Sequence, residues 1–178
     1  MKARASLIAT TVLFAFAVSV GPALSEPNPA PSPPPSSSDQ KPGSGKATKT
    51  KSKKEKRSEQ KFLDGYRVAY DLIQGGKYVE GIAALHALGH NDHPDVANYI
   101  GFASRKLGRY DDAKYWYDKA LASDPNHTRT LQYYGMWHLE QGNALKAKEH
   151  LEKIRAMCGT TCKEYVSLQE ALNGNIIY

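Results

Sequence analysis

Three histidines stand close together in the chain, at His86, His90 and His93. Histidine is the side chain that most often titrates near neutral pH or binds a metal, and two histidines four apart on one helix can share a metal ion. Here Gly89 is expected to end the helix before His90, and no glutamate stands between the first pair as in a metalloprotease motif. We therefore interpret all three as loop and surface histidines and predict no metal site, with a His-metal hydrolase as an alternative that metal analysis would test.

Other patterns that carry catalysis are missing from the sequence. It contains no glycine-rich nucleotide-binding loop and no serine elbow motif. We therefore predict a protein that is not an enzyme, with no catalytic residues and no cofactor.

The two cysteines, Cys158 and Cys162, are separated by Gly-Thr-Thr. In an oxidising compartment a pair this close is typical of a disulfide, and residues four apart on a helix lie about 6 Å apart, within reach of a bridge. Redox-active pairs usually have two intervening residues, so we favour a local staple over a catalytic pair.

The first 25 residues have the pattern of a secretory signal peptide. Lys2 and Arg4 precede an apolar run from Leu7 to Val20, and small residues follow near Ser25. The run is shorter than the ~20 residues that span a bilayer, so we favour a signal peptide over the alternative of an uncleaved anchor. We predict export, to the periplasm of a Gram-negative bacterium or else by secretion, with cleavage after Ser25 or after Ala23.

Residues 26–60 are rich in proline, serine and lysine and offer almost no apolar material, so we predict a disordered linker. The net charge of +6 comes from this linker, at +4, and from the signal peptide, at +2. Residues 61–178 carry fourteen charges of each sign, which does not support specific nucleic-acid binding by the folded part. The basic run is interpreted as a spacer, with a weak envelope or membrane-surface contact through residues 46–57 as the alternative.

From residue 61 onward the pattern predicts paired amphipathic helices and no strands. The segment from Ile100 to Pro125 also repeats approximately when it is shifted 34 residues forward or 32 back. The matched positions are Gly101 with Gly135 and Ala69, Gly108 with Gly142 and Gly76, Ala113 with Ala147 and Gly81, and Tyr117 with Leu151 and Leu85. Two helices in a period near 34 predict an all-α stack of repeats.

The middle stretch KLGRYDDAKYWYDKALASDPNH resembles the tetratricopeptide repeat family. The resemblance implies an α-solenoid of about three helix pairs, at residues 61–93, 94–127 and 128–161, closed by a capping helix over about 162–173. The first repeat is degenerate, and the third has Cys158-Gly159 where the family has Asp-Pro. The chain is also similar to small exported repeat proteins of Gram-negative bacteria.

In such arrays the first helix of each pair lines an inner, concave surface, which the resemblance makes the expected site for a partner protein or peptide. The residues projected onto it are Tyr66, Tyr70, Asn98, Phe102, Arg105, Lys106, Arg129, Gln132 and Met136. Exposed tyrosine, phenylalanine, methionine and arginine are typical of recognition surfaces. The alternative is that Tyr70, Phe102 and Met136 are partly buried packing residues. Family members that grip a C-terminal carboxylate use a Lys, Asn and Arg clamp here, and in this chain only Arg129 fits that role.

We therefore predict an interaction scaffold of the cell envelope. The alternative is a tethering protein whose basic linker binds anionic polymer or lipid.

Overall fold

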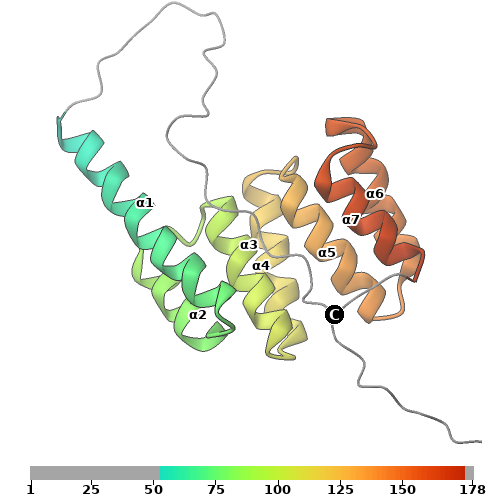
Figure 1. Cartoon of the computed structure of the whole chain (residues 1–178), viewed down its shortest axis with the longest axis horizontal. Helices are drawn as coiled ribbons and strands as arrows, with labels where there is room; N and C mark the ends of the chain where they lie inside the picture. Colours follow the sequence, from blue (N-terminus) through green and yellow to red (C-terminus); the bar gives the residue numbers. More distant parts are fainter. Residues whose placement is uncertain (1–52, 175–178) are drawn as a thin grey trace, which may run out of the picture.

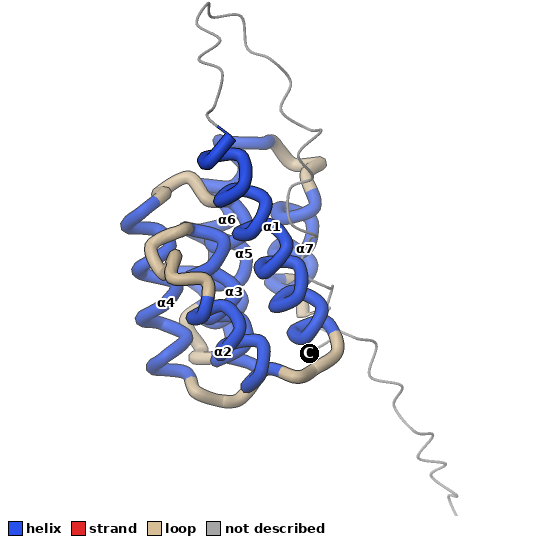
Figure 2. Tube along the Cα trace, turned by 90° about the vertical axis from the view of Figure 1, so that its left-hand side faces the viewer, coloured by secondary structure: helices blue, strands red, loops and turns tan. Residues whose placement is uncertain are grey.

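The computed structural model describes residues 53–174, which form seven α-helices and no strand. The helices are α1 (Lys53–Gln74), α2 (Tyr78–Ala87), α3 (Pro94–Lys106), α4 (Tyr110–Ser123), α5 (Thr128–Glu140), α6 (Ala144–Cys158) and α7 (Lys163–Leu172). Consecutive helices pack as the pairs α1 with α2, α3 with α4 and α5 with α6, which follow one another in a row (Figure 1). Helix α7 packs on both α5 and α6 and closes the row (Figure 2). The predicted all-α solenoid is confirmed.

The same turn joins the two helices of every pair. Gly76, Gly108 and Gly142 each have φ between 72° and 74°, a left-handed conformation that glycine adopts at no steric cost. In each turn the residue after the glycine donates its N–H to a carbonyl one turn back in the first helix, as in a Schellman cap. These bonds run from Lys77 to Leu72, from Arg109 to Ser104 and from Asn143 to His138, at 2.8–2.9 Å. The glycines that repeat in the sequence therefore form the same backbone turn in all three helix pairs.

Close backbone approach explains two further glycines of the predicted period. A Cβ built on Gly101 of α3 would stand 2.8 Å from the ring of Tyr117 in α4, which is fully buried. A Cβ on Gly135 of α5 would stand 2.6 Å from Leu168 of α7. The closing helix thus packs against the glycine of the third repeat with a buried leucine, in the way that Tyr117 packs against Gly101 in the second.

Helix α1 begins at Lys53, so residues 53–60, which the sequence analysis assigned to the disordered linker, are helical. The segment lacks proline and glycine and consists mainly of Lys, Glu, Gln and Arg, which are strong helix formers. Side-chain bonds within the helix add support, including Gln60 Nε2 to Asp64 Oδ1 at 2.8 Å. The predicted linker end was therefore wrong, because a count of apolar residues does not register helix propensity.

The predicted signal peptide and residues 26–52 of the predicted linker lie outside the described residues, and the remaining division into domains stays a prediction. Between Lys53 and Gly174, no helix is both long and apolar enough to cross a membrane.

Candidate partner-binding face

The structure brings side chains of α1, α3 and α5 together on one side of the row, which we call the inner face. Tyr70 of α1 contacts Tyr99 of α3 edge-on, with ring centroids 5.8 Å apart. Phe102 of α3 contacts Tyr133 of α5, with centroids 4.9 Å apart. The first helices of the three pairs are thus linked by aromatic contacts, as the resemblance implies.

The expectation that the nine predicted residues are exposed was wrong for six of them. The buried ones are Tyr66, Asn98, Phe102, Arg105, Gln132 and Met136, each at most 6% exposed. Tyr70, Lys106 and Arg129 are half-buried. Large aromatic side chains from neighbouring first helices fill the space between those helices, which a projection onto single helices does not capture. Whether the nine residues bind a partner stays a prediction.

Two tyrosines outside the nine predicted residues, Tyr99 and Tyr133, form the middle of the inner face. Tyr99 lies between Tyr66 and Arg129: its ring is 5.7 Å from that of Tyr66, and the Arg129 guanidinium stands 5.8 Å from its centroid. Tyr133 is fully packed and contacts Phe102. These tyrosines are separated by 34 residues, so the repeat period contained the signal that could have found them.

An ionic cluster joins α3 to α5 near the start of both helices. Asp95 accepts hydrogen bonds from Arg129 Nη1 at 2.6 Å and from His127 Nε2 at 3.2 Å. Burial alone would raise the pKa of the Asp95 carboxyl, but the His127 hydrogen bond and the Arg129 charge outweigh it and the pKa is lowered. Asp95 is therefore held as a carboxylate, and Arg129 already has a partner within the fold.

A second charged cluster lies at the other end of the same two helices. Arg105 donates to the carbonyl oxygen of Tyr133 at 3.1 Å, and its Nε lies 3.6 Å from Glu140. Lys106 stands 5.7 Å from the centroid of Phe102, and burial together with Arg105 lowers the pKa of this lysine. Burial also raises the pKa of Glu140 against the opposing effect of Arg105. The inner face therefore has charged groups at both ends and aromatic rings between them.

Asn98 lies between the two clusters and lacks partners. It follows Asp95 by three residues and precedes Phe102 by four, so all three share one face of α3. The side chain is 0% exposed, and neither Oδ1 nor Nδ2 forms a hydrogen bond with any described residue. An unpaired buried amide costs roughly 1–3 kcal/mol, so its presence here needs a reason.

The three histidines of the possible metal motif have structural roles. His86 Nδ1 is 3.1 Å from Asn91 Oδ1, while His90 and His93 each lie 5.0 Å from the Phe62 ring centroid. His93 also accepts the backbone N–H of Asp95 at 3.2 Å and so caps α3. Within the described part of the chain, no group of three His, Cys, Asp or Glu side chains is placed to hold a metal ion.

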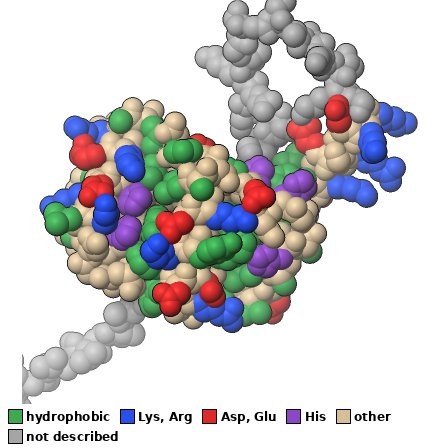
Figure 3. All heavy atoms as spheres, turned by 180° about the vertical axis from the view of Figure 1, so that it is seen from behind, with side chains coloured by type: hydrophobic (Ala, Val, Ile, Leu, Met, Phe, Trp, Pro, Cys, Tyr) green, Lys and Arg blue, Asp and Glu red, His purple; other side chains and the backbone are tan. Residues whose placement is uncertain are grey.

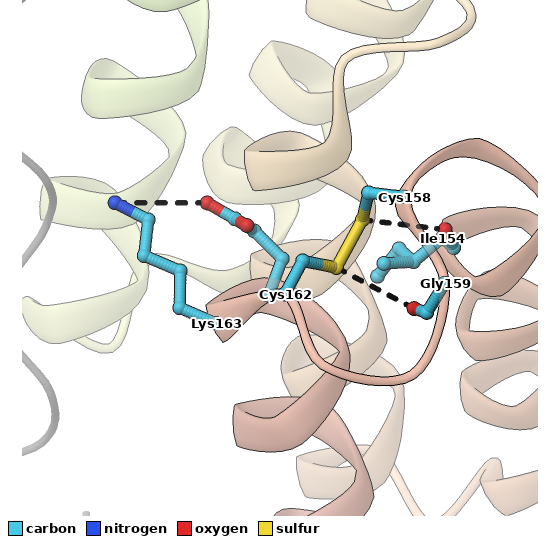
Figure 4. The surroundings of a disulfide bond; sticks show 6 residues. Ile154, Cys158, Gly159, Cys162 and Lys163 are labelled. Carbon is cyan, nitrogen blue, oxygen red and sulfur yellow. Dashed lines mark hydrogen bonds and ion pairs between the residues drawn. A yellow bond between two sulfur atoms is a disulfide. The ribbon is translucent and has the colours of Figure 1, made fainter.

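Cys158 and Cys162 form a disulfide that joins the last residue of α6 to the residue before α7 (Figure 4). It lies at the connection between the third pair and the closing helix, away from the inner-face contacts of α1 and α3. In this position the disulfide links the start of α7 to the end of α6.

Comparison with known proteins identifies the repeat. A family model described as tetratricopeptide repeat matches residues 94–127, which contain α3 and α4. Residues 94–127 are a tetratricopeptide repeat. It is 38% identical over 55 residues to the uncharacterized protein ycf37 of Guillardia theta, a match that covers 31% of this chain and 31% of that relative. This chain therefore matches only about a third of the length of this relative.

Solved structures share the fold of this chain. The Yersinia enterocolitica type III secretion translocator chaperone SycD, in an alternative dimer, has a TM-score of 0.55 at 19% identity, over 65% of this chain and 88% of SycD. PcrH in complex with the chaperone binding region of PopB has a TM-score of 0.54 at 21% identity, over 66% of this chain and 96% of PcrH. At these identities the likeness establishes the fold.

Proposed function

We propose that this tetratricopeptide repeat protein is a non-catalytic scaffold that holds an extended segment of a partner protein on its inner face. The observation that carries the proposal is Asn98, whose buried amide has no hydrogen-bond partner among the described residues. A primary amide can both donate and accept, and an extended peptide presents N–H and C=O groups that match it. The partner's backbone would therefore satisfy a group that the fold leaves unsatisfied.

The surroundings of Asn98 determine which segments fit. The rings of Tyr99 and Phe102 are buried and that of Tyr70 is half-buried, so they offer apolar area to the segment once the side chains that border them move aside. The half-buried side chains of Tyr70, Lys106 and Arg129 border this area, and the segment enters by displacing them. A partner with aliphatic or aromatic residues spaced along an extended stretch is the best match.

The solved structures support a partner of this class. PcrH, whose fold is similar, is described in complex with the chaperone binding region of PopB, and SycD is described as a translocator chaperone. Binding of protein segments is thus compatible with this arrangement of helices. The proposal assigns no catalytic role to any residue of the face.

We also propose that the protein works in the cell envelope, after export to the periplasm of a Gram-negative bacterium. The charged start, the apolar run from Leu7 to Val20 and the disulfide-bonded cysteines support this location. Fractionation of cells that produce a C-terminally tagged chain tests it. Recovery with cytoplasmic markers would contradict the location without affecting the binding proposal.

The binding proposal is tested with Asn98→Leu, which has a side chain of similar size but no amide. The full-length chain is immobilised and exposed to envelope extract of its source organism, with Asn126→Leu, in an exposed turn, as the matched control. We expect wild type and Asn126→Leu to retain the same protein and Asn98→Leu to lose it. We expect the melting temperature of Asn98→Leu to equal or exceed that of wild type, because an unpaired buried amide has been removed. Retention of the partner by Asn98→Leu would refute the proposal.

A further inference from the structure

The first turns of α1 extend beyond the helix pair to which the helix belongs. Helix α1 has 22 residues and its partner α2 has 10. Residues 53–61, about 13 Å of helix, are all exposed. We call them the arm, and Figure 1 shows it projecting from the upper left of the row. The arm buries no apolar side chain, so packing does not account for it.

Most charges on the arm are divided between two sides, while Lys56 lies between those sides, about 100° around the helix from Arg57. Lys53, Arg57 and Lys61 follow one another at intervals of four, and Lys54 is three residues before Arg57, so these four basic residues share one face. Glu55 and Glu59 are also four apart and lie about 160° around the helix from Arg57. The basic side chains form the blue cluster at the upper right of Figure 3, where the molecule is seen from behind.

The basic face points away from the stacked pairs. Tyr66, which is buried in the core, comes nine residues after Arg57, and this is two and a half turns, so the two lie on opposite sides of α1. Val68, eleven residues after Arg57, is on the basic side and is 58% exposed. The outward side of α1 therefore carries four cations and the exposed Val68. Asp64 lies between them on the same side, and its carboxylate is paired with Gln60 and Arg67.

We propose that this side of the arm is a docking surface for an anionic phospholipid bilayer. A cluster of four to eight lysines and arginines is enough to bind an anionic membrane surface, and Val68 adds an apolar contact below it. Lys46, Lys49 and Lys51 precede the arm in the sequence and raise the local positive charge. This role is independent of the proposed function, since the inner face is formed by other sides of α1, α3 and α5.

The separation of charges favours a flat surface over a nucleic acid. A helix in the major groove of DNA, which is about 12 Å wide, has phosphates on both flanks, so Glu55 and Glu59 would be repelled there. Against a bilayer only one face meets phosphate, and both glutamates face away from it. The arm projects from the row (Figure 1), so it can reach a plane before the helix pairs do.

Vesicle co-sedimentation of the full-length chain tests the proposal. The variant K53Q/K54Q/R57Q/K61Q removes the basic face, and K146Q/K148Q/K153Q/R155Q makes the same charge change on exposed residues of α6. Vesicles of phosphatidylcholine alone are compared with vesicles containing about 30% phosphatidylglycerol, at about 0.1 M salt. Binding of the N-terminal apolar segment to either vesicle is common to all three proteins, so the comparison isolates the effect of charge.

We expect wild type and the α6 variant to prefer anionic vesicles, and the arm variant to bind them at least tenfold more weakly, with circular dichroism showing all three folded. E55Q/E59Q should change the binding by less than about threefold, because these side chains face away from the lipid. Equal losses in the two quadruple variants, or equal binding of wild type to neutral and anionic vesicles, would overturn the proposal. The proposal would also be overturned if wild type bound a DNA duplex more tightly than anionic vesicles and the arm variant bound neither.

Discussion

The guanidinium of Arg129 in α5 lies 2.6 Å from the carboxylate of Asp95 in α3, and both side chains are only 16% exposed. His127, which immediately precedes α5, contacts the same carboxylate oxygen at 3.2 Å. One carboxylate thus fastens the start of the third helix pair to the start of the second. The ion pair is an interface element between repeats as well as part of the inner face.

Asp95→Ala should therefore weaken the contact between the second and third pairs. Removal of the carboxylate leaves the Arg129 cation largely buried without its partner, and we expect a loss of about 2–3 kcal/mol in the free energy of unfolding. Urea unfolding followed by circular dichroism measures it. Asp71→Ala, at an exposed position of α1, is the control and should change stability by less than about 0.5 kcal/mol. A similar loss of stability in both variants would show that the ion pair between Asp95 and Arg129 does not account for the effect.

The wild-type protein should lose the contribution of Asp95 only in strong acid. The folded protein lowers the pKa of this carboxyl below its ordinary value of 3.8, so the stabilisation is fully present above pH 4 and disappears as the pH falls further. Asp95→Asn should abolish this part of the acid dependence. A wild-type protein whose stability is constant between pH 4 and pH 2 would contradict the assignment.

We expect protonation of His150 in α6 to lower the free energy of unfolding at a milder pH than protonation of Asp95 does. The His150 side chain is 7% exposed and stacks on His138, and burial, with smaller effects of His138 and Lys153, lowers its pKa to about 4. Because the unfolded chain binds a proton near pH 6.5 and the folded chain does not, stability should fall as the pH drops from about 6.5 to about 4, by at most about 3 kcal/mol.

His150→Leu should flatten this part of the stability curve, measured by urea unfolding at pH 7, 6, 5 and 4. His86→Leu, at an exposed position of α2, should keep the wild-type slope. A parallel pH dependence in wild type and His150→Leu would mean that another group causes the acid sensitivity.

The repeat architecture could be predicted because backbone geometry and close packing restrict residue type. Gly76, Gly108 and Gly142 have positive φ, and Gly101 leaves room for the Tyr117 ring. Few residue types other than glycine fit these positions, so the repeat period is visible in the sequence. The burial of the inner face could not be predicted in this way. Tyr99 contacts Tyr66, 33 positions away, and Tyr133 contacts Phe102, 31 positions away, and a helical projection shows no such contact.

The start of α1 escaped prediction for a different reason. Compositional analysis equates a lack of apolar residues with disorder, whereas residues 53–60 are helical through propensity and local side-chain pairs. The position of Asn98 in the repeat predicts that it lies on the inner face, and the structure adds that its amide is unpaired. The sequence therefore predicts the residues of the inner face but not the unpaired Asn98 amide.

Substitutions of the two close-packed glycines should differ in cost. In Gly101→Ala the new methyl group meets the fully buried Tyr117 ring and the Ala113 carbonyl, which have no room to move, and we expect a loss of about 2 kcal/mol despite better helix propensity. In Gly135→Ala the methyl group meets the branched end of Leu168 in the terminal helix α7, which can shift, so the loss should be smaller. Thermal unfolding of both variants checks the order, and a larger loss at Gly135 would show that α7 is held more rigidly than α4.

Loss of the disulfide should loosen α7 without unfolding the repeats. The bridge holds Cys162, the residue before α7, against the end of α6, and Leu168 of α7 is completely buried. Because the closed loop is short, we expect C158S/C162S to lower the free energy of unfolding by only about 2 kcal/mol. A reductant should bring wild type to the stability of the double variant and leave the double variant unchanged. Hydrogen exchange should rise mainly in residues 163–172; an equal rise throughout α1 to α6 would show instead that the bridge stabilises the whole stack.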